Sequence, residues 1–168
     1  HSNEGDSVML RVETEVKAST IQGLGLFAVE FIPKGKLIAI FPYGAEILSE
    51  DEYQNEQRAG NEVIIWSAVR WIGDYFLTGD EIGKEERINH SSDPTMLYHC
   101  GLCFAYRDIK QGEELTVDYR HFLAIDDVNS FDDSMVNGAP KIDGEDPTKL
   151  LVESAEEIVK LFKTVELS

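Results

Sequence analysis

Apolar residues in the first 120 positions fall in short runs that favour β-strands over long helices. Residues 8–17 alternate between apolar and polar side chains, which is the period of a half-buried strand. Further strand-like runs, several of them bounded by glycine or proline turns, cover residues 26–31, 37–41, 62–71, 75–78, 103–107 and 115–117. Many short strands at short spacing predict a mostly β fold with irregular connections.

Two segments have helical patterns instead. Ser49 is followed three residues later by Glu52, a capping box that predicts a helix of about ten residues. Pro147 and Thr148 open a second helix, whose apolar residues share one face: Leu150, Leu151, Ala155, Ile158, Val159 and Phe162. We therefore expect one short helix inserted among the strands and a C-terminal helix that packs on or near the domain.

The stretch before the C-terminal helix differs from the rest in composition. Residues 124–147 hold seven acidic residues and a single lysine. This predicts three parts: a domain over residues 8–122, an acidic linker or flap over 123–147, and a helix over 148–168.

The charge of the chain limits its partners. Fifteen Lys and Arg stand against 32 Asp and Glu, which leaves a net charge of −17 at pH 7. That excess argues against direct nucleic-acid binding and suits a basic protein partner, although solubility alone would also explain it. The sequence contains no apolar run of about 18 residues, the length that a membrane span needs, and no secretion signal is visible. We therefore expect an intracellular protein, nuclear in a eukaryote and cytoplasmic otherwise.

The two cysteines, Cys100 and Cys103, form a C-x-x-C pair. Such a pair can be half of a zinc site, a redox pair or two ordinary strand residues. A tetrahedral zinc site needs two more ligands, and the chain offers only four histidines besides carboxylates. The apolar, aromatic surroundings favour strand residues, and we predict that no metal is bound.

Three segments carry candidate chemistry. They are Gly23-Leu24-Gly25, Asn89-His90 within Asn-His-Ser-Ser-Asp-Pro, and a Gly-Glu-Glu-Leu-Thr-Val-Asp-Tyr run that ends at Tyr119. Each has an ordinary alternative: a plain turn, a capped turn, and a hairpin edge with an exposed tyrosine. The first also lacks the third glycine and the following helix of a dinucleotide-binding fingerprint.

Together and in this order, the three segments resemble the SET-domain family of protein-lysine methyltransferases. The resemblance covers about residues 18–122. It implies a fold of small curved sheets with a threaded C-terminal segment, a pseudoknot that would bring Asn89 and His90 beside Tyr119. Threading of this kind is an exception among protein folds.

The resemblance also implies a site. S-adenosylmethionine would be bound by Gly23, Leu24, Gly25, Asn89 and His90, and would leave as S-adenosylhomocysteine. Tyr119, together with Tyr98, would act in catalysis. The channel for the substrate lysine would be lined by Tyr98, Val117 and Phe122, and the substrate would be a basic protein such as a histone. The alternative is a SET-like module that binds a peptide without turnover.

The sequence departs from the family pattern at several positions. Val117 stands where many relatives have an aromatic residue that helps to set the number of methyl groups added. Ser92 replaces a usual cysteine, and the cysteine-rich zinc segments that flank many relatives are missing from this sequence. The closing wall of the channel would then come from Phe122, Phe131 or the C-terminal helix.

Overall fold

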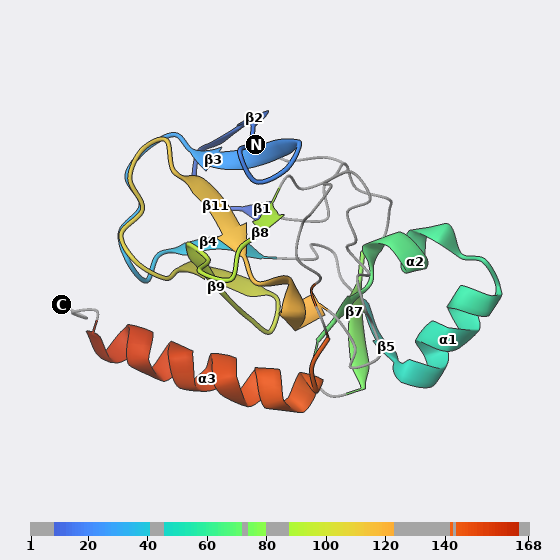
Figure 1. Cartoon of the computed structure of the whole chain (residues 1–168). Helices are drawn as coiled ribbons and strands as arrows, with labels where there is room; N and C mark the ends of the chain where they lie inside the picture. Colours follow the sequence, from blue (N-terminus) through green and yellow to red (C-terminus); the bar gives the residue numbers. More distant parts are fainter. Residues whose placement is uncertain are drawn as a thin grey trace.

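The structure, a computed structural model, describes residues 9–40, 46–71, 74–79, 88–122, 142 and 144–164. Within these residues, short strands form three small sheets and helices are few (Figure 1). The predicted mostly β fold is confirmed.

The first sheet is antiparallel throughout and has the strand order β1-β4-β10-β9. Cys100 and Gly101 form the two-residue turn between β9 and β10, and both have positive φ angles, 50° and 87°. Such turns match the twist of the strands they connect. The strands of this sheet are β1 (Met9–Leu10), β4 (Leu37–Ile40), β9 (Met96–His99) and β10 (Leu102–Ala105).

The second sheet has the order β2-β3-β11-β8, and its pairing explains the fold. Strand β11 runs antiparallel to β3 and parallel to β8, so that Thr116 lies opposite Asn89 and Val117 opposite His90. A late strand thus lies between two earlier ones, as the predicted threading requires. The strands are β2 (Thr14–Ala18), β3 (Leu24–Ala28), β8 (Asn89–His90) and β11 (Glu114–Val117).

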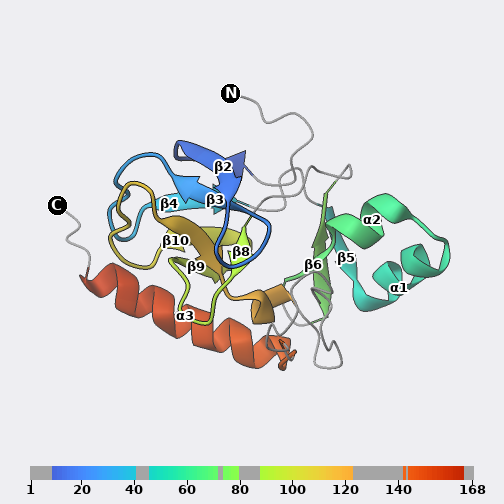
Figure 2. The ribbon, with the colours of Figure 1, turned by 45° about the horizontal axis from the view of Figure 1, so that its top comes forward.

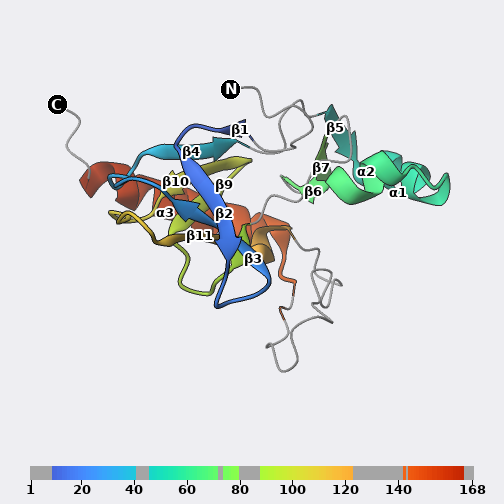
Figure 3. The same cartoon turned by 90° about the horizontal axis from the view of Figure 1, so that it is seen from above.

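A third sheet and two helices form the insertion at one end of the molecule (Figures 2 and 3). The sheet has the order β5-β7-β6, from strands β5 (Glu46–Ser49), β6 (Val69–Arg70) and β7 (Tyr75–Thr78). Helix α1 (Glu50–Arg58) begins at the predicted Ser49–Glu52 capping box. It packs on the sheet through Tyr53, whose ring stacks on Phe76 at 4.2 Å between centroids.

The hydrophobic core lies between the first two sheets. Most of its members are less than 6% exposed, and strands of both sheets contribute residues to it. The core consists of Leu26, Ala28, Ile32, Ile38, Ala39, Ile88, Met96, Tyr98, Cys103, Ala105, Ile109, Leu115 and Val117. Both strands that carry the candidate motifs, β8 and β11, therefore rest on this core.

Helix α3 (Pro147–Thr164) lies along β9 (Figure 1). Asp146 caps it, since its carboxylate accepts from the backbone nitrogen of Thr148 at 3.0 Å, and proline is well suited to the first helical position. The buried face holds Leu150, Ser154 and Leu161. Val159, which we predicted on the packing face, is 50% exposed, because these three buried residues are four and seven positions apart and share a helix face opposite to Val159.

Two strand predictions were wrong. Residues 62–71 form helix α2 (Glu62–Ser67) followed by β6, because the Asn61 side chain caps the backbone nitrogen of Ile64 and so starts a helical turn. Residues 8–17 do not form one strand: β1 pairs with β4 in the first sheet, and β2 pairs with β3 in the second. The chain has to break between them to change sheets.

Most of the predicted acidic linker, 123–147, falls outside the described residues, and the division into three parts stays a prediction. Its last residues belong structurally to α3, since Asp146 caps the helix. None of the described helices is long and apolar enough to cross a membrane.

We predict that the protein loses stability as the pH falls below 6.5. Burial lowers the pKa values of His99 and His121, which face α3, below their ordinary value of 6.5. The unfolded chain therefore binds more protons than the folded one below that pH, so protonation favours unfolding. Urea unfolding at pH 7.5, 6.5 and 5.0 should show a falling midpoint. This window lies above the ordinary values of the carboxyl groups, and a flat midpoint across it would contradict the prediction.

Candidate active site

The Gly23 segment forms the turn between β2 and β3. Gly23 has a φ angle of 45°, and a side chain there would meet no atom within 4 Å, so the turn faces open space. The Ser19 nitrogen closes the turn by donating to the Gly23 carbonyl at 2.9 Å. Leu24 is 44% exposed. Exposed main chain beside an open space is what a site needs to bind a ligand through its backbone.

Gly25 has a different reason to be glycine. It lies within β3, and a β-carbon on it would be 2.1 Å from a carboxylate oxygen of Glu114. The Glu114 side chain thus fills the space beside Gly25. Its carboxylate accepts from the Ser19 hydroxyl at 2.9 Å, across 95 residues of sequence. Strand β11 therefore supports the glycine turn from below.

Asn89 completes this contact. Its amide nitrogen lies 2.7 Å from Glu114 Oε1, 3.1 Å from the Leu24 carbonyl and 3.2 Å from the Gln22 carbonyl. One buried side chain thus joins β8, β11 and the glycine turn. The structure brings together the predicted cofactor residues Gly23, Leu24, Gly25 and Asn89, and it adds Ser19 and Glu114, which the sequence interpretation missed.

His90 holds the backbone of Tyr119. Its Nδ1 accepts from the Tyr119 nitrogen at 3.0 Å, and the two rings lie 5.3 Å apart. Burial lowers the pKa of His90, while Asp118 opposes the shift and Arg120 adds to it. The imidazole is therefore neutral at pH 7 and can accept this hydrogen bond. The predicted neighbourhood of His90 and Tyr119 is present.

The Tyr119 hydroxyl is fixed by a main-chain carbonyl. Tyr119 begins the 3₁₀ turn η1 (Tyr119–Phe122), and its hydroxyl donates to the Ile88 carbonyl at 2.5 Å. Because the hydroxyl proton is used in this bond, the oxygen presents lone pairs to any further partner. An oxygen held in this way can accept from an amine or from a polarised C–H group.

Aromatic rings continue from Tyr119 into the domain. Phe122 lies between Tyr119 and Tyr98, with ring centroids 5.9 Å and 4.8 Å from theirs. Burial raises the pKa of Tyr98 above its ordinary value of 10.0, so that its hydroxyl keeps its proton at neutral pH. Three of the predicted site residues thus form one aromatic row, while Val117 is 1% exposed in the core and does not line the cavity described next.

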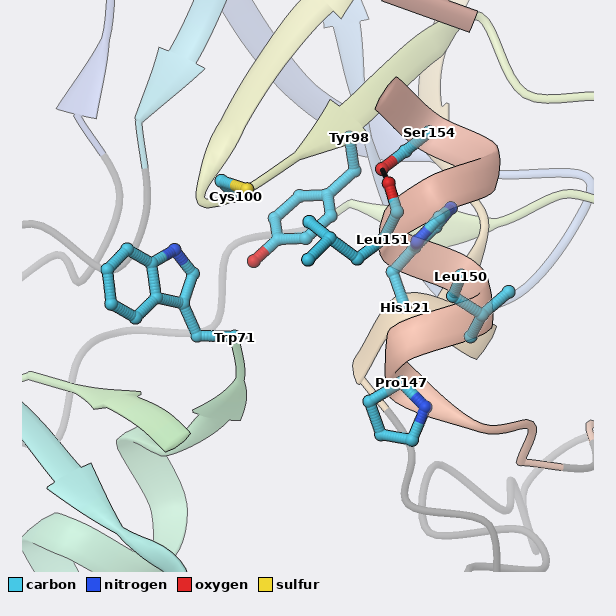
Figure 4. Close-up of a pocket in the computed structure, with 8 residues that line it drawn as sticks. All are labelled: Trp71, Tyr98, Cys100, His121, Pro147, Leu150, Leu151 and Ser154. Carbon is cyan, nitrogen blue, oxygen red and sulfur yellow. Dashed lines mark hydrogen bonds between the residues drawn. The ribbon is translucent and has the colours of Figure 1, made fainter. Parts of the chain in front are cut away.

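A small cavity of about 10 Å³ lies at the far end of this row (Figure 4). Tyr98 and Trp71 face each other across it, and the Trp71 indole nitrogen is buried without a hydrogen-bond partner among the described residues. Helix α3 closes the other side. The cavity is lined by Trp71, Tyr98, Cys100, His121, Pro147, Leu150, Leu151 and Ser154.

The residues around this cavity bear on which segment forms the closing wall of the predicted lysine channel. Of the three candidates, α3 contributes four of the lining residues, and the 3₁₀ turn that begins at Tyr119 contributes His121. Phe131 lies outside the described residues. Trp71 and His121 were missed, because a tryptophan at the end of a strand-like run and a histidine after a tyrosine have no distinctive local pattern.

Neither cysteine forms a disulfide. Cys103 is a buried strand residue of β10, as predicted, and burial raises its pKa, whereas Cys100 lies in the β9–β10 turn. Among the described residues, no group of three or more His, Cys, Asp or Glu side chains is arranged to hold a metal ion.

Comparison with known families decides the relationship. A model of the SET domain matches residues 23–120, which is more than half of the chain. The chain belongs to the SET-domain family. The match begins at Gly23 and ends one residue after Tyr119, so the three motifs lie within it, and α3 lies outside it.

Two curated proteins of Plasmodium falciparum (isolate 3D7) are similar to this SET domain. The "Variant-silencing SET domain-containing protein" is 28% identical over 125 residues, 65% of this chain and 5% of its own length. The protein named "Putative histone-lysine N-methyltransferase 1" is 32% identical over 125 residues, 62% of this chain and 2% of its own length. The chain thus spans a very small part of both relatives.

Among solved structures, a chain of "Structure of ctPRC2 in complex with H3K27me3 and H3K27M" is similar, with a TM-score of 0.43 and 24% identity. The similarity covers 64% of this chain and 14% of that one.

We predict that Gly25→Ala destabilises the SET domain by about 1–3 kcal/mol, the usual cost of overpacking. The added methyl group would displace the Glu114 carboxylate and with it Asn89. In a Glu114→Ala background the same substitution should cost much less, since the space is then free. Urea unfolding of the wild type, the two single variants and the double variant measures the free energy of unfolding of each. An equal loss of that free energy on Gly25→Ala in both backgrounds would refute the steric explanation.

Proposed function

We propose that this SET domain transfers a methyl group from S-adenosylmethionine to the side-chain amine of a lysine in a protein. The observation that carries the proposal is the Tyr119 hydroxyl, bonded to the Ile88 carbonyl one residue before the Asn89 side chain that supports the glycine turn. Asn89 and His90 lie on β8, which pairs with β11, and Tyr119 begins the turn η1 two residues after β11 ends.

The residues around the glycine turn fit the cofactor. The open space at Gly23 and the exposed Leu24 offer main-chain groups, and the Asn89 amide, held by Glu114, fixes the turn in place. Gly23, Leu24, Gly25, Asn89 and His90 would hold the cofactor here. When bound, S-adenosylmethionine supplies a sulfonium methyl group that an amine can attack in line, so that S-adenosylhomocysteine is released.

The aromatic row prepares the lysine. A free lysine has a pKa near 10.4, so it must lose a proton before it can act as a nucleophile. Apolar walls disfavour the charged ammonium form and lower that pKa. Tyr98 and Phe122 provide such walls, and the Tyr119 oxygen can accept a hydrogen bond from the amine and orient its lone pair. Alignment at contact distance then accounts for most of the rate.

The substrate we propose is a basic protein segment such as a histone tail. Two observations support this choice: the net charge of −17, and the printed name of one relative, which describes a histone-lysine methyltransferase. The charge also speaks against direct nucleic-acid binding. Such a substrate would place the protein inside the cell, in the nucleus of a eukaryote.

A second function deserves a test because the cavity is small. A volume of about 10 Å³ is at the lower limit for one water molecule, far less than a lysine side chain needs, and the adjacent pocket of about 130 Å³ that shares Tyr98 and His121 with it is a separate space. The domain could therefore hold a peptide without turnover, as an inactive SET-like module. Under the catalytic proposal, the walls must move apart when the lysine enters.

One assay distinguishes the two functions. The protein is incubated with methyl-labelled S-adenosylmethionine and a panel of basic proteins, including core histones. We expect label on lysine, and we expect Tyr119→Phe to lower turnover by roughly 10²-fold or more, as loss of a transition-state contact does, with little change in cofactor affinity. Peptide binding without label would favour the inactive module, and full activity of Tyr119→Phe would remove its catalytic role.

Attraction between the acidic domain and a basic peptide should depend on salt. Charges are screened beyond about 8 Å at physiological ionic strength. We predict that the peptide KM rises with salt while kcat stays nearly constant, because screening weakens encounter and not chemistry. Replacing Asp126, Asp127, Asp132 and Asp133, all outside the described residues, by Asn should flatten this slope. A salt slope equal to that of the wild type would exclude these residues from recognition.

A further inference from the structure

Arg120 follows Tyr119 directly, and its guanidinium contacts three carboxylates. It donates to both carboxylate oxygens of Asp118 at 2.6–3.1 Å and to Glu145 at 2.7 Å. It also lies 3.7 Å from the Glu153 carboxylate. Its side chain is 33% exposed. A planar guanidinium is suited to such a multiple contact, since its five N–H groups point in fixed directions.

The contact with Asp118 fixes the turn that holds Tyr119. The Asp118 side chain is 10% exposed and also accepts from the Arg120 backbone nitrogen at 3.0 Å. Burial alone would raise the pKa of Asp118, but the hydrogen bonds from Arg120 lower it below 3.8. The pair is therefore ionised at neutral pH, and it fastens η1 to the end of β11.

The other two contacts reach the helix. Glu145 lies just before the cap of α3, and Glu153 lies about two turns into it. The same first turns carry Leu150 and Leu151 to the cavity, where they meet Tyr98 and His121. One side chain thus joins the tyrosine turn to the helix that walls the cavity.

The later turns of α3 are held separately. Ser154 bonds to His99 at 2.7 Å, Glu157 accepts from the Tyr106 hydroxyl, and Phe162 packs edge-on against Phe104. Loss of the Arg120 contacts would therefore free the first two turns of the helix and leave the rest docked.

We propose that Arg120 is a positioning residue: through Glu145 and Glu153 it sets where the first two turns of α3 stand as the movable wall of the substrate cavity. This Arg120 latch acts through the helix and does not touch the reacting groups. Its kinetic consequence rests on the proposed function. Its structural consequence does not.

The test removes the link to α3 and keeps the Arg120–Asp118 pair, so that the buried carboxylate of Asp118 is never left alone. In Glu145→Gln/Glu153→Gln, amide exchange over residues 148–153 should accelerate roughly fivefold, as expected for loss of ion pairs at a half-exposed site, while residues 157–162 keep their rates. Glu156→Gln, which removes one carboxylate charge at an exposed position of the same helix, serves as the control and should leave both segments unchanged.

The kinetic arm uses an unmethylated peptide that contains the lysine labelled in the assay above. We expect the double variant to raise the peptide KM severalfold, with kcat and cofactor affinity within about twofold of the wild type. Arg120→Gln should raise the peptide KM as well, and it should also lower kcat, because it leaves the buried Asp118 carboxylate without its partner in the turn that holds Tyr119. Arg120→Lys should have a smaller effect, since a lysine keeps one charged contact. Arg120→Gln combined with Glu145→Gln should be no worse than Arg120→Gln alone.

The outcomes separate the claims. Unchanged exchange over 148–153 would overturn the latch. Faster exchange with an unchanged peptide KM would show that α3 does not wall the substrate site, and would overturn the positioning role. A wild-type protein that labels no substrate would refute the proposed function, and the exchange arm would still decide whether the latch exists.

Discussion

The position of β11 between β3 and β8 is the constraint on which the whole site depends. Its antiparallel pairing with β3 places Glu114 beside the glycine turn. Its parallel pairing with β8 places Thr116 and Val117 opposite Asn89 and His90. Because side chains alternate across a strand, a shift of one residue would turn Glu114 away from Asn89 and move Tyr119 off the Ile88 carbonyl. The register of these short strands thus determines the geometry of the glycine turn, Asn89, His90 and Tyr119.

Charge is used sparingly within the site itself. The carboxylate of Glu114 supports the glycine turn, where we propose that the cofactor binds, and it is satisfied by Ser19 and Asn89. The substrate side is aromatic and aliphatic, which suits an amine that has to be neutral when it reacts. The ion pairs around Arg120 lie beside Tyr119 in the sequence, and they join η1 to the segment that begins α3.

The parts that could be predicted from the sequence are those whose signal is local. The Ser49–Glu52 box located α1, Pro147 located α3, and the order of three short motifs identified the family before any fold was known. The residues that were missed depend on contacts far apart in the chain. Glu114 could be assigned a role only when the carboxylate was seen beside Gly25, and Trp71 only when the insertion was seen to face Tyr98. Residues 62–71 look like a strand by composition, and the Asn61 cap overrides that preference.

The long sequence separation across the second sheet has a consequence for how the protein acquires activity. Ser19 and Glu114 are 95 residues apart, and closing such a loop carries an entropic cost before any contact repays it. A nascent chain can form the β2–β3 hairpin early, but its glycine turn lacks the contact between Ser19 and Glu114 until residues 114–119 have been synthesised and inserted. The proposed cofactor site is therefore completed late, when β11 takes its place between β3 and β8. Any partner or chaperone that delays the placement of β11 between β3 and β8 would also delay the completion of this proposed site.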